Sequence, residues 1–122
     1  MNKIKVKKSK LHGRGVFATK DIQKGEIIEI CHALVLSKSD TKKIDDTDLY
    51  NYYFSWKGGQ SALALGHGSL YNHSYTPNAK YIKHASSKII SFVALQTIKS
   101  TQEITINYNG NPLSKEKVWF EK

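Results

Sequence analysis

The stretch EITINY, residues 103–108, carries the most regular strand pattern in the chain. Apolar and polar residues alternate, which places Ile104, Ile106 and Tyr108 on one face of a predicted strand. If the isoleucines face the core, the Tyr108 hydroxyl also points inward and needs a hydrogen-bond partner. A packed ring with a satisfied hydroxyl is the ordinary interpretation of such a tyrosine, and a functional role is the alternative.

Upstream, residues 71–78 read YNHSYTPN and follow two glycines, Gly66 and Gly68. Glycines let a backbone bend toward a ligand, and asparagine and histidine side chains can then turn to it. Two other interpretations stay open. Residues 72–74 match a glycosylation sequon, although no export signal supports it, and His73 could be a capping or core histidine. No two histidines here have the i, i+4 spacing of a zinc-binding helix, so no metal site is predicted.

A third segment, HGRGVFA at residues 12–18, places a Gly-x-Gly turn at the start of a strand. Such a turn can present backbone N–H and C=O groups to a ligand. The segment lacks the preceding strand and following helix of a dinucleotide-binding fingerprint.

The rest of the chain predicts a mostly-β domain with one short helix. The helix is expected through residues 49–54, with N-cap candidates at residues 45–47. Further strands are expected at residues 4–6, 15–18, 27–36 (two strands or one bent strand), 61–65 and 89–95. A length of 122 residues predicts a single domain, residues 1–122.

Composition excludes several classes of protein. No apolar run approaches the roughly 18–20 residues that a membrane-spanning helix needs. The basic N-terminus, MNKIKVKKSK, is not followed by an apolar segment, so no secretory signal is expected. One cysteine, Cys31, excludes an internal disulfide framework and a multi-cysteine zinc site. An intracellular setting is therefore expected.

The net charge of +9 favours an anionic partner such as nucleic acid. Eighteen of the nineteen cations are lysines and only Arg14 is an arginine, which argues against base-specific DNA reading. The lysines of residues 3–10 are expected on the solvent side of an edge strand. Four aspartates cluster in one segment, expected to be loop and helix N-terminus: Asp40, Asp45, Asp46 and Asp48.

In this order, residues 13–18, 21–28, 71–79 and 103–108 resemble the SET-domain family of protein lysine methyltransferases. The likeness covers roughly residues 3–110, and the size resembles compact stand-alone viral and bacterial members. The resemblance implies the SET-domain (β-clip-like) fold: several small curved sheets, a short helix and a C-terminal pseudoknot-like crossing. Residues 109–122 would form a short tail that closes the site.

The resemblance also implies S-adenosylmethionine as the cofactor and assigns site residues. Tyr108 matches the catalytic tyrosine, and Tyr52, Tyr71 and Ile106 are expected along the substrate channel. Ile106 stands where members of the family often carry Phe or Tyr. Isoleucine has no hydroxyl to hold a water molecule there, and this favours the addition of more than one methyl group. The expected cofactor-binding residues are Arg14 and Gly15 through their backbone, Asn72 at the methionyl end, His73 at the adenine edge, and Trp119 and Phe120 as lids or stacking rings. A self-anchoring C-terminal helix is the alternative for the last two.

The implied partner is a protein that carries the target lysine in a histone-like or other basic tail. A second copy of the chain and nucleic acid, contacted without sequence specificity, are further partners that the sequence allows. Contact with a membrane is not expected. The alternative function is a catalytically weak SET-fold module that binds nucleic acid or a protein. The expected location is the cytoplasm, or the host nucleus for a viral or intracellular bacterial source. The sequence departs from many chromatin enzymes of the family in two places. Residues 65–71 replace the Gly-Asn-x-x-Arg-Phe motif that precedes Asn-His-Ser in those enzymes, and their cysteine-rich, zinc-binding tail is absent.

Overall fold

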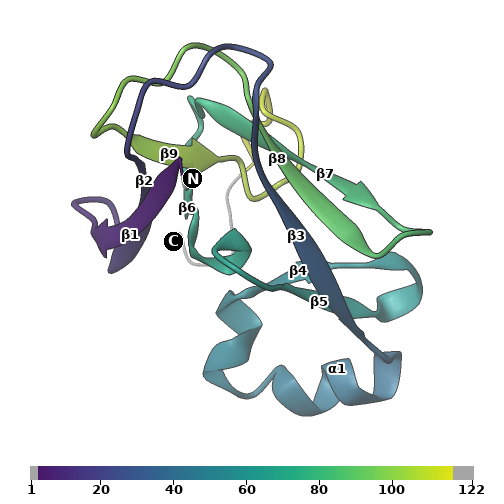
Figure 1. Ribbon diagram of the computed structural model, residues 1–122. Helices are drawn as coiled ribbons and strands as arrows, with labels where there is room; N and C mark the ends of the chain where they lie inside the picture. Colours follow the sequence, from purple (N-terminus) through teal and green to yellow (C-terminus); the bar gives the residue numbers. More distant parts are fainter. Residues whose placement is uncertain (1–2, 117–122) are drawn as a thin grey trace.

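The computed structural model describes residues 3–116 (Figure 1). Two β-sheets and a short helix make up the described chain. In chain order the elements are β1 (Ile4–Lys8), β2 (Arg14–Ala18), β3 (Ile27–Leu36), α1 (Lys38–Ile44), the 3-10 helix η1 (Asp48–Asn51), β4 (Tyr53–Ser55), η2 (Lys57–Gly59), β5 (Ser61–Ala64), η3 (Gly68–Leu70), β6 (Asn72–His73), β7 (Ala79–His84), β8 (Ile89–Ala94) and β9 (Glu103–Ile106).

The four-stranded sheet has the order β1-β2-β9-β6. Strands β1 and β2 form an antiparallel hairpin, and β2 pairs antiparallel with β9. Strand β6 pairs with β9 in parallel, so that Asn72 lies opposite Thr105 and His73 opposite Ile106. This sheet therefore brings together three segments that lie far apart in the sequence: residues 12–18, 71–78 and 103–108.

The five-stranded sheet has the order β4-β5-β3-β8-β7, and all its pairings are antiparallel. Strand β3 is a single long strand with a register irregularity between Ile27 and Glu29. Residues 27–36 thus form the one bent strand of the two predicted possibilities. Strands β4 and β7 are the two edges of this sheet, and they approach each other across a cavity described below.

The core forms where the inner faces of both sheets meet. Phe92 is fully buried on β8 and stacks on the Tyr71 ring, with ring centroids 4.3 Å apart. Ile104 and Ile106 are buried as the alternation in β9 predicts, and Tyr108 packs against the same cluster just beyond the strand. Thr105 is also buried, because its backbone N–H and hydroxyl contact Asn78 on the other side of β9.

The predicted helix over residues 49–54 is wrong. The α-helix lies earlier, at Lys38–Ile44, where the Ser37 hydroxyl caps it by accepting from the Asp40 N–H at 3.0 Å. Residues 48–51 form one 3-10 turn, capped by Thr47, and the aromatic residues that follow form strand β4. Phe54 favours the strand because its ring packs edge-on against Tyr81 of the edge strand β7 and Phe92 of β8.

The predicted fold class is confirmed: the chain is mostly β, with curled sheets and one short helix. Lysine-rich β1 is an edge strand, as its charge pattern indicates. Strand β7 was not predicted, because its sequence AKYIKH does not alternate cleanly between apolar and polar residues. Among the described residues, no helix has the length and apolar character needed to cross a membrane.

Candidate active site

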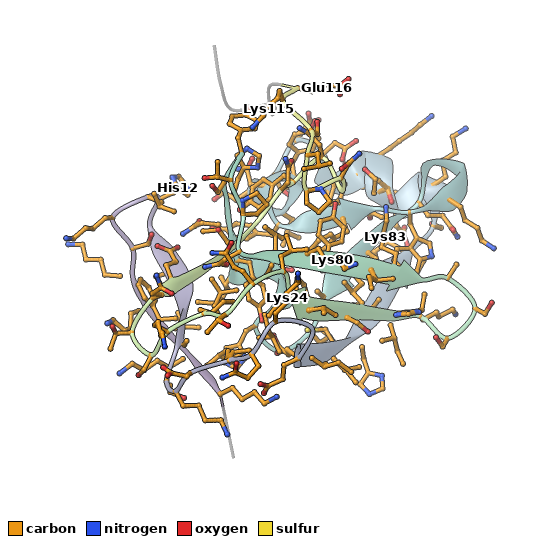
Figure 2. All side chains as sticks on the ribbon, turned by 90° about the horizontal axis from the view of Figure 1, so that it is seen from above. His12, Lys24, Lys80, Lys83, Lys115 and Glu116 are labelled. Atoms are coloured by element: carbon orange, nitrogen blue, oxygen red, sulfur yellow. The ribbon has the colours of Figure 1, made fainter. Side chains whose placement is uncertain are left out.

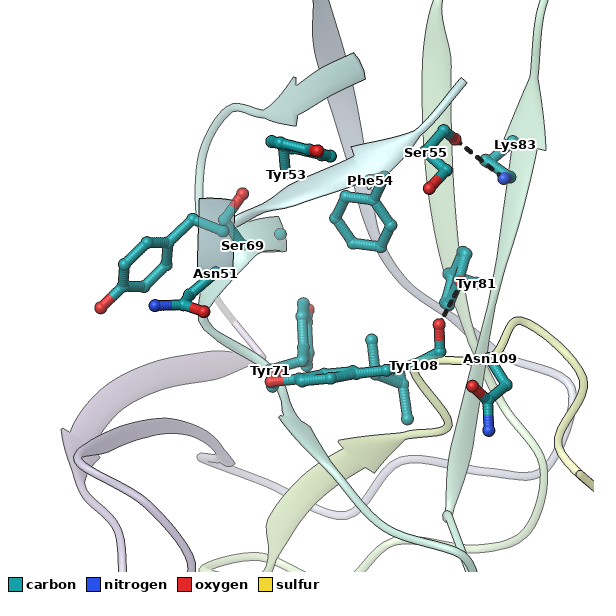
Figure 3. A pocket seen from close by; sticks show the side chains of 13 residues that line it. Asn51, Tyr53, Phe54, Ser55, Ser69, Tyr71, Tyr81, Lys83, Tyr108 and Asn109 are labelled. Carbon is teal, nitrogen blue, oxygen red and sulfur yellow. Dashed lines mark hydrogen bonds between the residues drawn. The ribbon is translucent and has the colours of Figure 1, made fainter. Parts of the chain in front are cut away.

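Two neighbouring cavities share part of their lining. The loop cavity, about 440 Å³, is bounded by residues 11–14 before β2 and by Asn72 and His73 of β6. The aromatic cavity, about 350 Å³, lies between the edge strands β4 and β7, and Figure 3 shows its tyrosine and phenylalanine walls. Four residues line both cavities: Asn51, Tyr52, Ser69 and Tyr108. The two spaces therefore adjoin along these four residues, of which Tyr108 is one.

Three hydrogen bonds hold Tyr108 at this junction. Its backbone N–H donates to His73 Nδ1 at 3.0 Å, and its carbonyl accepts from the Tyr81 hydroxyl at 3.2 Å. Its own hydroxyl donates to the Tyr71 carbonyl at 2.7 Å. Burial, helped by the negative charge of Glu103 and by Tyr52, raises the pKa of Tyr108 to about 12. The hydroxyl therefore keeps its proton at neutral pH and is fixed in one orientation.

Tyr71 is held just as firmly. Its side chain is 1% exposed, and its hydroxyl donates to Glu29 Oε1 at 2.8 Å. The other oxygen of Glu29 accepts from the His67 N–H at 3.0 Å and lies 3.1 Å from His67 Nδ1. Burial and the Glu29 carboxylate raise the pKa of Tyr71. The Tyr71 carbonyl that accepts the Tyr108 hydrogen bond thus belongs to a residue whose side chain is itself fixed by Glu29.

Asn72 ties the loop cavity together. Its side-chain amide nitrogen lies 3.1 Å from the His12 carbonyl, 3.0 Å from the Arg14 carbonyl and 2.7 Å from Glu103 Oε2. A Cβ atom at Gly15 would clash with the Glu103 carboxylate and lie 2.9 Å from the Asn72 amide. Gly15 is therefore required for β2 to pass this close to Asn72 and Glu103.

The loop cavity fits S-adenosylmethionine in size and chemistry. Its volume lies within the roughly 300–1,000 Å³ of small-molecule sites. Leu11, Leu70 and Tyr52 give it apolar surface, and Arg14, Asn72 and His73 add polar groups. Arg14 is the one arginine of the chain, and its guanidinium suits a ligand carboxylate. Gly13 at φ +47° forms the bend of the residue 11–14 turn, with open space where a side chain would stand.

The predicted site residues are placed as follows. Tyr52, Tyr71 and Ile106 line the aromatic cavity, and Tyr52 also borders the loop cavity. Arg14, Asn72 and His73 line the loop cavity, whereas Gly15 supports it from behind. The Tyr71 hydroxyl is bound to Glu29, so Tyr71 offers the channel its ring and its backbone. Trp119 and Phe120 lie outside the described residues.

Sequence reasoning did not single out several lining residues. Phe54 on β4 and Tyr81 on β7 both line the aromatic cavity, and their rings contact each other edge to face with centroids 4.9 Å apart. Lys83 shares the inner face of β7 with Tyr81, but residues 79–84 do not alternate cleanly, so no local pattern marked either residue. Glu29 lines neither cavity but anchors Tyr71, and the signal for it was a single carboxylate within a largely apolar strand.

Comparison with known proteins agrees with this geometry. The SET domain family matches residues 13–109, and the chain belongs to this family. A relative from Schizosaccharomyces pombe, "Histone-lysine N-methyltransferase, H3 lysine-37 specific", is 34% identical over 119 residues, which cover 97% of this chain and 77% of the relative. The Drosophila melanogaster "Histone-lysine N-methyltransferase trithorax" is 31% identical over 94% of this chain, which spans 3% of that protein. The predicted enzyme class, a lysine methyltransferase, is confirmed.

Solved structures show the same fold. A candidate histone methyltransferase from Plasmodium falciparum is 30% identical and superposes with a TM-score of 0.72, with 99% of each chain covered. A chain of ctPRC2 in complex with H3K27me3 and H3K27M reaches a TM-score of 0.75 over 88% of this chain and 14% of its own length. At 21% identity, the second match shows the fold alone.

Proposed function

We propose that this chain is an S-adenosylmethionine-dependent protein-lysine N-methyltransferase that acts on lysines in histone-like tails. The observation that carries the proposal is the meeting of two cavities at Tyr108. One cavity suits the cofactor, and the other is a narrow aromatic space suited to an extended lysine side chain. Methyl transfer is an in-line displacement, and it needs donor and acceptor to approach one point from two spaces.

S-adenosylmethionine, when bound, supplies a methyl group on a cationic sulfonium. Arg14, Asn72 and His73 would hold it in the loop cavity. Tyr108 and the Tyr71 carbonyl lie where the two cavities meet and would orient the target amine. The rings of Phe54, Tyr81 and Tyr108 would shield a lysine side chain bound in the aromatic cavity from water.

The nucleophile must be a neutral amine, although a free lysine has a pKa of about 10.4. Burial among tyrosines disfavours the ammonium form of the target lysine. The positive charge of the S-adenosylmethionine sulfonium would disfavour it further. Among the described residues that line the aromatic cavity, none is a carboxylate that would hold the amine as a cation. Deprotonation is therefore favoured as the substrate enters.

Two observations support a histone-like substrate. The relatives described above include proteins named as histone-lysine methyltransferases. The acidic segment also adjoins the aromatic cavity: the Tyr53 hydroxyl donates to Asp45 at 2.8 Å, and Asn51 and Tyr52 line the cavity. Acidic groups near the entrance attract a basic tail.

Calorimetric titration with S-adenosylhomocysteine tests the cofactor step, and transfer of labelled methyl to histone H3 tests the reaction. We expect micromolar binding by the wild type and label incorporated at a lysine. Absence of binding at millimolar ligand, with the chain folded, would contradict the proposal. Binding without transfer to any protein would point to the second candidate.

The second candidate is a nucleic-acid-binding module, and charge asymmetry favours it. Residues 1–24 hold eight basic side chains against one acidic, a net +7 of the total +9. Lys5, Lys8, Lys10 and Lys20 are exposed on or beside the β1–β2 hairpin. Neutralising these four lysines should weaken the binding of duplex DNA and make its affinity less dependent on salt concentration. Salt-independent or absent binding by the wild type would remove this candidate.

A further inference from the structure

A charged side chain lines the aromatic cavity. Among the described residues that line it, Lys83 alone is charged, and the others are aromatic, amide, hydroxyl, glycine or isoleucine residues. Lys83 is an exposed residue on β7, and its Nζ donates to the Ser55 carbonyl at 2.9 Å. Figure 3 shows this bond at one end of the cavity, with Asn51 at the other end.

The fold fixes the position of this ammonium group. Ser55 belongs to β4 and Lys83 to β7, which are the two edges of the five-stranded sheet. The edges face each other across the cavity, and the Phe54–Tyr81 ring contact spans the same gap. The hydrogen bond to Ser55 therefore holds a positive charge at the rim. It uses one of three N–H donors, so two can still donate to a ligand.

We propose that Lys83 forms an anion-accepting subsite that selects the residue next to the target lysine. The proposal rests on the function proposed above, which places the target lysine in this cavity. A substrate carboxylate beside the target lysine would pair with the Lys83 ammonium, whereas an arginine or lysine there would be repelled. At the position beside the target lysine, the enzyme should therefore prefer an acidic residue over a neutral one, and a neutral residue over a basic one.

The other charged groups near the cavity do not cancel this effect. Two of the lining tyrosines contact acidic side chains: the Tyr53 hydroxyl donates to Asp45 and the Tyr71 hydroxyl to Glu29. Neither carboxylate lines the cavity, and each is engaged by a tyrosine hydroxyl. The acidic segment can thus attract basic residues farther along a tail while Lys83 selects against them beside the target.

A simpler interpretation is that Lys83 only joins two strand edges. A strand-joining residue would change stability when replaced but would not change which substrate is preferred. The decisive measurement is therefore the ratio of kcat/KM values between peptides, and not activity alone.

The experiment uses peptides from a protein that the wild type methylates, varied at one residue on each side of the target lysine. Each position carries Glu, Gln or Arg in turn. We expect the wild type to prefer Glu over Arg by about two- to fivefold at one of these positions, as for a partly exposed ion pair. Lys83→Gln should abolish the preference and Lys83→Glu should invert it.

Two further variants complete the design. Lys83→Arg keeps the charge and should keep the order of preference. Lys80→Gln is the matched control: Lys80 comes from the same strand (Figure 2), but it does not line the cavity. Thermal unfolding and S-adenosylhomocysteine binding of each variant establish that it is folded.

An unchanged preference in folded, active Lys83→Gln would overturn the subsite and leave the proposed function standing. Failure of the wild type to methylate any protein would overturn both. A preference lost equally in Lys80→Gln would also overturn the subsite, because the effect would then follow net charge.

Discussion

The Tyr108 hydroxyl donates a 2.7 Å hydrogen bond to the backbone carbonyl of Tyr71. This bond joins Tyr108, two residues after β9, to Tyr71, the residue before β6, and these two strands pair in parallel. The same Tyr71 is anchored through its hydroxyl to Glu29 on β3. The orientation of the Tyr108 side chain thus depends on both sheets, which is how the fold prepares the junction of the two cavities.

Removing this hydroxyl should affect catalysis more than folding. Tyr108→Phe keeps the ring packed beside His73 and loses the bond to the Tyr71 carbonyl. We expect methyl transfer to fall at least about tenfold, or ~1.4 kcal/mol of barrier, with S-adenosylhomocysteine affinity close to wild type. Single-turnover transfer of labelled methyl measures this. A fully active variant would show that Tyr108 does not orient the reacting groups.

Asn72 should contribute to both stability and cofactor affinity. Asn72→Ala leaves the His12 and Arg14 carbonyls and Glu103 without their shared donor, so we expect a stability loss of about 1–3 kcal/mol. Affinity for S-adenosylhomocysteine should also fall, because the residue 11–14 loop loses its anchor.

Asn78→Ala is the matched control for Asn72→Ala. Asn78 also ties β9 through two side-chain hydrogen bonds, to the Glu103 carbonyl and the Thr105 N–H, but it lines neither cavity. It should lower the unfolding temperature while affinity stays near wild type. Equal affinity losses in both variants would assign the effect of Asn72 to general destabilisation.

Local patterns predicted the parts of this fold that depend on near neighbours in the sequence. The alternation in residues 103–108 identified β9 and the inward direction of Tyr108, and the lysine pattern identified β1 as an edge. The helix was misplaced because Phe54 gains its packing from Tyr81, which lies 27 residues later. The wall formed by β4 and β7 is likewise non-local, so no window of sequence contains Ser55 and Lys83 together.

Gly68 should tolerate no side chain. A Cβ atom there would clash with the Ala64 Cβ and lie 2.9 Å from Cys31 Sγ and 3.2 Å from the Phe92 ring. Because the core is close-packed, we expect Gly68→Ala to lower the free energy of unfolding by about 1–3 kcal/mol. Denaturant unfolding measures this. Ala64→Gly in the same chain removes the worst contact and should recover part of the loss, whereas no recovery would place the strain elsewhere.

The acidic segment should affect substrate affinity. Replacing Asp40, Asp45, Asp46 and Asp48 by asparagine removes four negative charges and retains an acceptor for the Tyr53 hydroxyl. We expect KM for a basic peptide to rise about two- to fivefold at low ionic strength and less in high salt. Replacing Asp21 and Glu116 by their amides removes two charges elsewhere, and it controls for net charge against a variant in which two of the four aspartates are replaced. An unchanged KM would exclude this segment from substrate binding.

Alkaline pH should destabilise the fold in a defined window. Burial raises the pKa of Tyr108 to about 12, and that of Cys31, beside Glu29, also to about 12; burial likewise raises the pKa of Tyr81. A group whose pKa is raised by folding contributes its stability below its unfolded pKa, and that contribution is lost as pH rises toward the folded pKa. We expect the free energy of unfolding to fall from about pH 9, where the Cys31 thiol begins to ionise in the unfolded chain, to about pH 12, by up to ~1.4 kcal/mol per pH unit for each such group.

Urea unfolding at pH 8, 10 and 11 measures this slope. Tyr81→Phe removes one ionisable hydroxyl and should make the slope shallower, while it also releases the Tyr108 carbonyl and lowers stability at every pH. A flat profile between pH 9 and 11 would mean that these groups ionise alike in the folded and unfolded chain, so that burial does not hold their protons.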